Sequence, residues 1–108
     1  MARYLLHGRY DAQMTQGLLA GGAASRRDAV QALAASVGGS VIDEIRWAFG
    51  GTESYVLMEL PDDEAAHAIV LTVTSVPGTS WADAIKLLDA DSVDRAIAKS
   101  AAFRPPGS

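Results

Sequence analysis

The chain contains no cysteine, so it can form no disulfide and offers no thiolate for nucleophilic or metal chemistry. Histidine is almost as scarce. His7 and His67 lie 60 residues apart and show none of the ligand spacings typical of metal sites. The sequence also lacks a phosphate-binding loop, a dinucleotide fingerprint and the G-x-S-x-G nucleophile motif. We therefore expect no metal and no cofactor.

Clustered basic charge is missing as well. The net charge is −4, and Arg26-Arg27 is the only adjacent basic pair in the chain. Proteins that bind nucleic acids need clustered lysine and arginine to displace counterions from the phosphates. We therefore expect no nucleic-acid partner.

Long apolar runs are absent too. None approaches the roughly 18 residues that a helix needs to cross a bilayer. The first eight residues hold too short an apolar stretch for a secretory signal peptide. The expectation is a cytoplasmic protein with no membrane partner.

The composition is that of a globular domain. Hydrophobic residues make up 49% of the 108 residues, which is enough for the core of a single domain. Charged residues make up 20%, below the usual share of about 25%. This lower charge suggests that part of the surface is buried against another subunit. We expect one domain over residues 1–103 and a flexible tail over residues 104–108.

Residues 49–66 predict local structure most clearly. Gly50-Gly51 can adopt backbone angles that other residues avoid, which favours a turn. The apolar run that follows, 54–60, is rich in residues that pack on a pleated sheet. Asp62 can then cap a helix, with Asp63 and Glu64 at the positive end of its dipole.

The remaining elements follow from apolar periodicity and stop signals. Ser25, with Asp28 three residues later, resembles a capping box, and Gly38-Gly39 supplies a helix stop. Between Asp11 and Ala24 we expect no more than a short helical turn at 14–20. The predicted strands are 3–10, 40–49, 54–60 and 82–88, and the predicted helices are 25–37, 62–75 and 92–101, the last capped by Ser92.

This element order is β-α-β-β-α-β with a trailing helix. It predicts an α+β, ferredoxin-like fold, in which helices cover one face of a four-stranded antiparallel sheet. Most strand positions are apolar on both faces, so the uncovered face cannot be fully polar. Soluble monomers rarely expose a large apolar patch. We therefore expect self-association, as a homodimer or a higher homo-oligomer, through the open face of the sheet.

The chain resembles the GYD domain, a small bacterial family, over residues 2–100. The resemblance rests on the Gly38-Gly39 stop, the glycine turn, the apolar strand and the run Pro61-Asp62-Asp63-Glu64-Ala65-Ala66. The family's Gly-Tyr-Asp signature falls at Gly51-Thr52-Glu53, so its aromatic residue is absent unless Tyr55 replaces it. The resemblance implies a ferredoxin-like fold paired into a dimeric α/β barrel, and it assigns no catalytic residue.

Six side chains are candidates for lining a ligand cavity. His7 lies in the middle of a predicted strand, where its imidazole can serve as a base or a ligand. Alternatively, it can be a half-buried residue bonded to a neighbouring strand. Glu44 and Arg46 share one strand face, where Glu59 and Lys86 could join them, although solvated cross-strand pairs are the alternative. The aromatic candidates can instead form core or dimer contacts. The candidates are His7, Arg9, Glu44, Arg46, Trp47 and Tyr55.

Two functions fit this pattern. The first is a non-enzymatic oligomeric module that binds a small molecule in a cavity between subunits. The second is a cofactor-independent monooxygenase or isomerase of the dimeric α/β-barrel type. In that enzyme His7 would be the base, Arg9 or Arg46 would hold a developing oxyanion, and Trp47 or Tyr55 would shape the pocket. The second hypothesis predicts that His7 lines a closed cavity together with an arginine, and a His7 that lies under the helices or in open solvent would rule it out.

Overall fold

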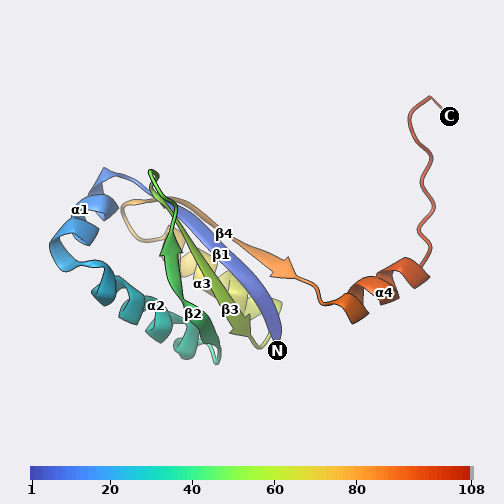
Figure 1. Ribbon diagram of the computed structural model, residues 1–108, viewed down its shortest axis with the longest axis horizontal. Coiled ribbons are helices and arrows are strands. Elements are labelled where there is room, and N and C mark those ends of the chain that lie inside the picture. The colour runs from blue at the N-terminus through green and yellow to red at the C-terminus, as the bar shows by residue number, and fades with distance from the viewer. Residues whose placement is uncertain (108) are drawn as a thin grey trace.

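The computed structural model describes residues 1–107 (Figure 1). Its elements are β1 (Ala2–Tyr10), α1 (Ala12–Gly21), α2 (Ala23–Ser36), β2 (Ser40–Trp47), β3 (Glu53–Leu60), α3 (Asp63–Thr74), β4 (Thr79–Leu87) and α4 (Ala90–Ala98). No helix in this part of the chain combines the length and the apolar character that crossing a membrane requires.

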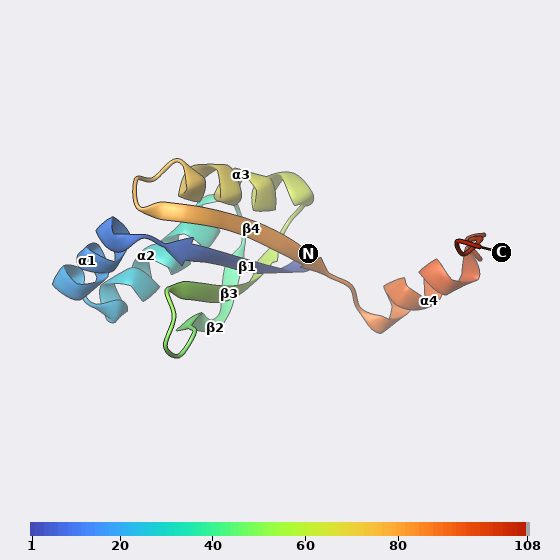
Figure 2. The ribbon, with the colours of Figure 1, turned by 90° about the horizontal axis from the view of Figure 1, so that it is seen from above.

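The four strands form one sheet in the order β2-β3-β1-β4, and every neighbouring pair is antiparallel. This is the α+β, ferredoxin-like arrangement that the sequence predicts. Helices α2 and α3 pack on one face of the sheet, and Figure 2 shows α3 beside β4 on that side. Among the described elements no helix covers the other face, which we call the open face.

Alternation along the strands builds the core. On β3, Ser54, Val56, Met58 and Leu60 are buried, whereas the residues between them are only partly buried. Successive side chains of a strand point to opposite faces, so the buried set faces the helices. The helices complete the core with small and branched side chains. The buried core consists of Tyr4, Leu6, Val30, Ala34, Ile45, Val56, Met58, Leu60, Ala65, Ala66 and Ile69.

Two of the predicted helix signals are confirmed. The Asp62 carboxylate accepts a hydrogen bond of 2.8 Å from the backbone N–H of Ala65, which caps α3. At the end of α2, Gly38 has a φ of 84°, and the N–H of Gly39 donates to the carbonyl of Ala34 at 3.0 Å. Both contacts satisfy backbone groups that a helix end leaves unpaired.

The region before α2 differs from the prediction. Residues 12–21 form a complete helix, because the Asp11 carboxylate accepts hydrogen bonds from the N–H groups of Gln13 and Met14. Ser25 does not cap α2, so that prediction is wrong. The helix begins at Ala23, directly after Gly22 at a φ of 83°, and this turn starts α2 before the chain reaches Ser25.

The C-terminal elements begin earlier than predicted. β4 starts at Thr79 and pairs with β1 along nearly its whole length. The N-cap of α4 is Asp89, whose carboxylate accepts from the N–H of Ser92 at 2.8 Å, so Ser92 is the donor at this cap. Asp and Ser are both good caps, and local sequence alone does not decide between them.

A buried tyrosine ties three elements together. The Tyr4 hydroxyl of β1 donates to the Asp63 carboxylate at the start of α3 over 2.5 Å, and Lys86 of β4 contacts the same oxygen at 2.9 Å. The hydrogen bond to Asp63, with burial of the ring, raises the pKa of Tyr4 to about 12. The bonds from Tyr4 and Lys86 in turn lower the pKa of Asp63.

Two glycine substitutions are expected to have opposite effects. A Cβ at Gly39 would lie 2.5 Å from Leu60 Cδ2 and closer still to the Glu59 carbonyl, whereas one at Gly17, inside α1, would meet nothing within 4 Å. Gly39→Ala should therefore lower the free energy of unfolding by about 1–3 kcal/mol or more. Gly17→Ala should raise it by up to about 1 kcal/mol through helix propensity. Urea unfolding of both variants tests this, and equal effects would contradict it.

Tyr4→Phe is expected to change the pH dependence of stability. Removing the hydroxyl should cost about 1 kcal/mol at neutral pH, because a hydrogen bond to a carboxylate is lost. Folding lowers the pKa of Asp63, which stabilises the protein at pH values above the pKa of Asp63 in the unfolded chain, near 4. This stabilisation disappears as the pH falls through the pKa of Asp63 in the folded protein. The gap between wild type and variant should therefore narrow as the pH falls from neutral to below about 4. Unfolding measured across that range checks it, and a constant gap would refute the linkage.

Candidate functional site

The open face carries an apolar row that crosses all four strands. Leu5 of β1 lies opposite Leu57 of β3 on one side and Ile85 of β4 on the other, and Leu57 lies opposite Ile42 of β2. None of these four side chains belongs to the buried core, and Ile85 is 45% exposed. The open face therefore offers water a continuous strip of aliphatic surface.

The next row on the same face is polar and aromatic. His7 of β1 lies between Tyr55 of β3 and Asp83 of β4, and Arg46 of β2 lies beyond Tyr55. The His7 ring stacks on Tyr55, with centroids 5.5 Å apart and an angle of 10°. Trp81 meets the same ring edge-on at 4.7 Å. These neighbours leave only 18% of the His7 side chain exposed, although no described helix covers it.

Asp83 of β4 lies beside the imidazole. Its Oδ1 lies 2.5 Å from His7 Nδ1. The contact lacks the geometry of a hydrogen bond. With a hydrogen on Nδ1, Nε2 is the ring nitrogen that can accept a proton or a hydrogen bond from a ligand.

Tyr55 is held in place in a similar way. Its hydroxyl donates to Glu53 Oε2 at 2.9 Å. This hydrogen bond, followed by burial and the charge of Glu53, raises the pKa of Tyr55. The phenol therefore remains protonated at neutral pH and presents its ring to His7 and its oxygen to Glu53.

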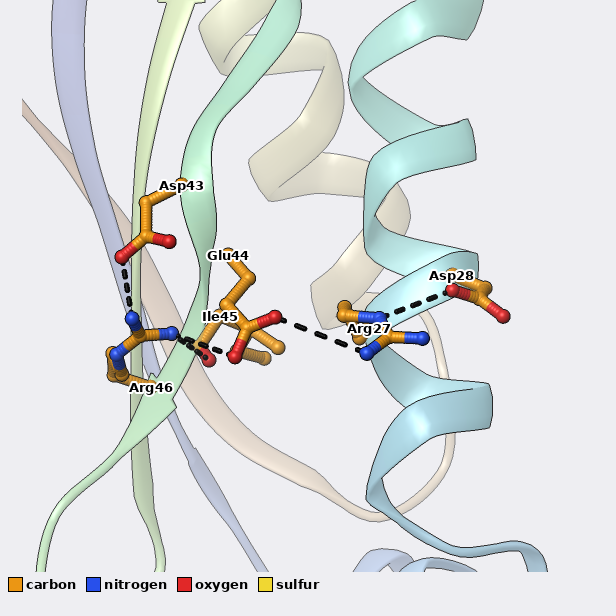
Figure 3. Close-up of polar contacts among 6 residues, drawn as sticks. All are labelled: Arg27, Asp28, Asp43, Glu44, Ile45 and Arg46. Atoms are coloured by element: carbon orange, nitrogen blue, oxygen red, sulfur yellow. Dashed lines mark hydrogen bonds and ion pairs between the residues drawn. The ribbon is translucent and has the colours of Figure 1, made fainter.

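A separate charge network occupies the edge of the sheet (Figure 3). Asp43 has a φ of 66°, and the register of β2 shifts between Ile42 and Arg46. This irregularity brings the Arg46 guanidinium against the Asp43 carboxylate and 2.9 Å from Glu44. Glu44 also lies 3.9 Å from Arg27 of α2. The network therefore joins β2 to the helix layer.

The expected grouping of Glu44 and Arg46 with Glu59 and Lys86 does not form. Glu59 pairs with Arg3 at 3.4 Å, and Lys86 contacts Asp63 on the helix side of the sheet. The register of the strands explains why this group does not form. Glu59 lies opposite Ser40 and Arg3, at the far end of β2 from Arg46.

The structure brings some of the six predicted residues together and separates others. His7 and Tyr55 are in direct contact, Arg46 follows Tyr55 in the same row, and Arg9 lies in the next row opposite Glu53 and Trp81. Trp47 lies opposite the buried Ser54 and packs against the core. Its side chain is therefore on the face of the sheet that the helices cover, away from His7. Glu44 belongs to the edge network.

Asp83 is the main residue that sequence reasoning missed. Its position two residues after Trp81 and two before Ile85 places all three on one strand face. That alternation is visible in the sequence. Which of these residues lies opposite His7 depends on the register between β1 and β4, which no local pattern specifies.

A small hollow lies between the sheet and the helices. Its volume is about 80 Å³, and its lining is mostly apolar. Gly8, Arg26 and Thr79 contribute to its wall, as do His7 and Arg9 of β1. For comparison, an engineered apolar cavity of about 150 Å³ binds benzene. The hollow is therefore too small for most substrates, and the open face is the stronger candidate site. Nowhere in residues 1–107 do three or more metal-ligating side chains gather closely enough to hold a metal ion.

The two hydrogen-bonded tyrosines predict a distinctive titration. Tyr4 and Tyr55 should ionise above the ordinary value near 10, because ionisation of each breaks a hydrogen bond to a carboxylate. Glu53→Gln should lower the pKa of Tyr55 and leave that of Tyr4 unchanged. Absorbance at 295 nm, with Tyr55→Phe to assign the phenol, measures this. An unchanged Tyr55 titration in Glu53→Gln would contradict the assigned contact.

One comparison with known proteins gives a match. The family model described as the GYD domain matches residues 4–97, which is most of the chain. Searches of curated proteins and of solved structures found no significant match. The match to the family model confirms the resemblance predicted from the sequence. It spans every strand and helix except the last residue of α4 and the first two of β1. The chain belongs to the GYD domain family.

Proposed function

We propose that this protein is a self-associating binding module in which two copies cover each other's open face and enclose a small molecule. The observation that carries the proposal is the apolar row Leu5, Ile42, Leu57 and Ile85, which runs beside the row containing His7. Covering the first row removes aliphatic surface from water. The same contact encloses the second row.

Self-association is supported by the nature of the open face. An antiparallel sheet with one solvated face normally shows polar side chains there. Here the central strands present Leu5 and Leu57 side by side on that face. Exposed apolar strips of this kind mark interaction surfaces. A two-fold dimer is the simplest solution, because the same strip on both copies is then buried at once.

The rings and charges of the second row suggest the class of ligand. Tyr55 and His7 in this row, with Trp81 in the next, offer aromatic faces and edges, and Nε2 of His7 can bond a polar group. Arg9, in the adjacent row, adds a cation. A planar small molecule that carries a carbonyl or acidic oxygen matches this combination. Enclosure by a second copy would supply the low dielectric in which such contacts are strong.

Native mass spectrometry of protein purified from cells tests both halves of the proposal. Wild type should appear as a dimer that carries a small molecule. Leu57→Lys should weaken the dimer by about 100-fold or more, because it places a charge in an apolar contact, and should lose the molecule. The control is Leu71→Lys on the outer side of α3, where the native leucine is 58% exposed. A wild type that is monomeric at micromolar concentration, or equal weakening by both substitutions, would refute the proposal.

The pairing of His7 with Asp83 supports the second candidate, a cofactor-independent monooxygenase or isomerase. An imidazole with a carboxylate beside Nδ1 can take a proton at Nε2, which is the role of a general base. Arg9 would stabilise the developing negative charge. Arg46 suits that role less well, because two acidic residues already contact it. A retained molecule with an acidic C–H or O–H bond that is converted on incubation would favour the enzyme, and a molecule recovered unchanged would favour the binding module.

A further inference from the structure

The end of the chain leaves the body of the protein. β4 continues to Leu87, and after Leu88 and Asp89 the helix α4 lies well beyond the end of the sheet (Figures 1 and 2). The Cα radius of gyration is 17.0 Å, whereas a compact chain of this length has about 13 Å. The longest dimension, 56 Å, includes this projecting segment. We call residues 88–98 the arm.

The arm is amphipathic but buries nothing. Ala90, Val93 and Ile97 recur at the spacing of one helix face, while Asp91 and Arg95 lie on the other. None of the residues of α4 is buried, and Val93 and Ile97 are 44% and 69% exposed. An isolated helix of this length is unstable in water, so a helix normally owes its stability to packing of its apolar face. The arm therefore needs a surface on which to pack.

The exposed apolar side chains gather at this end of the chain. Of the eleven large hydrophobic residues that are exposed in the described structure, six lie between positions 85 and 103. They are Ile85, Leu87, Leu88, Val93, Ile97 and Phe103.

Charge argues for a protein partner. Residues 88–107 contain three aspartates and three basic residues, so the segment has no net charge. Helices that bind anionic lipid surfaces carry lysine and arginine along the polar face, and nucleic-acid binding likewise needs excess basic charge. The arm has Asp91 and Asp94 on its polar face beside Arg95. A neutral amphipathic helix suits an apolar groove on another protein.

Continuity identifies that protein as a second copy of this chain. Ile85 and Leu87 lie opposite Leu5 and Arg3, so both belong to the open face. The apolar surface of the arm thus begins where the apolar row of the open face ends. We propose that each copy extends its arm to the other copy in the dimer and packs the Val93 and Ile97 face against it. This inference rests on the self-association proposed above, and it adds the exchange of the arm.

Distance measurements between spin labels test the exchange, and the absence of native cysteine allows clean labelling. Ala98→Cys places a label on the arm, and Gln31→Cys places one on the outer surface of α2. In dimers mixed from the two single variants, we expect a narrow distribution between the arm of one copy and the body of the other. The double variant, which carries both labels in one chain, is diluted with unlabelled protein and reports the distance within that chain. This distance should be longer than the distance between the two chains of the mixed dimer.

The outcomes separate this inference from the proposed function. A short distance within one chain, or a broad distribution both within and between chains in a stable dimer, would overturn the exchange and leave self-association intact. A monomeric wild type would overturn both. A short, narrow distance between chains that is absent within a chain supports the exchange.

Substitutions on the arm supply a second measurement. Val93→Asp and Ile97→Asp should each weaken the dimer by about 10-fold or more, since each places a carboxylate on the face that packs. Ala98→Asp, on the polar side of the same helix, is the matched control and should change dimer affinity less than about 2-fold. Sedimentation velocity over a concentration series measures these affinities. Equal behaviour of Val93→Asp, Ile97→Asp and Ala98→Asp would overturn the proposed packing face.

Discussion

One-sided coverage of the sheet is the constraint on which the other features of this protein depend. Along β1 and β3 every second side chain enters the core beneath α2 and α3, and the side chains between them must lie on the face that these helices leave open. The open-face set includes Leu5 and Leu57 as well as His7 and Tyr55. A chain that needed only one packed face would place polar residues at all four positions. The two leucines are the observation behind the proposed self-association, and the two ring-bearing residues beside them would lie at the same contact.

The His7 site is built almost entirely from cross-strand neighbours. The residues around the imidazole come from β3 and β4, and none is close to His7 in the sequence. Strand pairing thus fixes the stacking of Tyr55 and the approach of Asp83 with the same backbone hydrogen bonds that hold the sheet together. These groups would need little rearrangement to bind the proposed ligand. Rigid, preformed groups lose little conformational entropy on binding, which favours a specific ligand over a broad range of ligands.

The sequence predicted what depends on local chemistry. The helix stop at Gly38-Gly39 and the cap at Asp62 involve residues only a few positions apart, and both are confirmed. The fold class followed from the order of such elements. The missed features depend on contacts between distant segments. Asp83 faces His7 through the register of two strands, and the β2 irregularity at Asp43 turns Glu44 toward α2. Ser25 was mistaken for a cap because Gly22, three residues earlier, already starts the helix.

Covering the open face would also change the chemistry of the site. In the single chain, the carboxylate of Asp83 is 57% exposed, so water screens its attraction for the imidazole. Burial of the same pair between two copies lowers the local dielectric and strengthens that attraction. A ligand that bridges both copies would add its own binding free energy to the dimer by mass action. Ligand binding and self-association would then be coupled, because the surface that hides the apolar row also closes the site around His7.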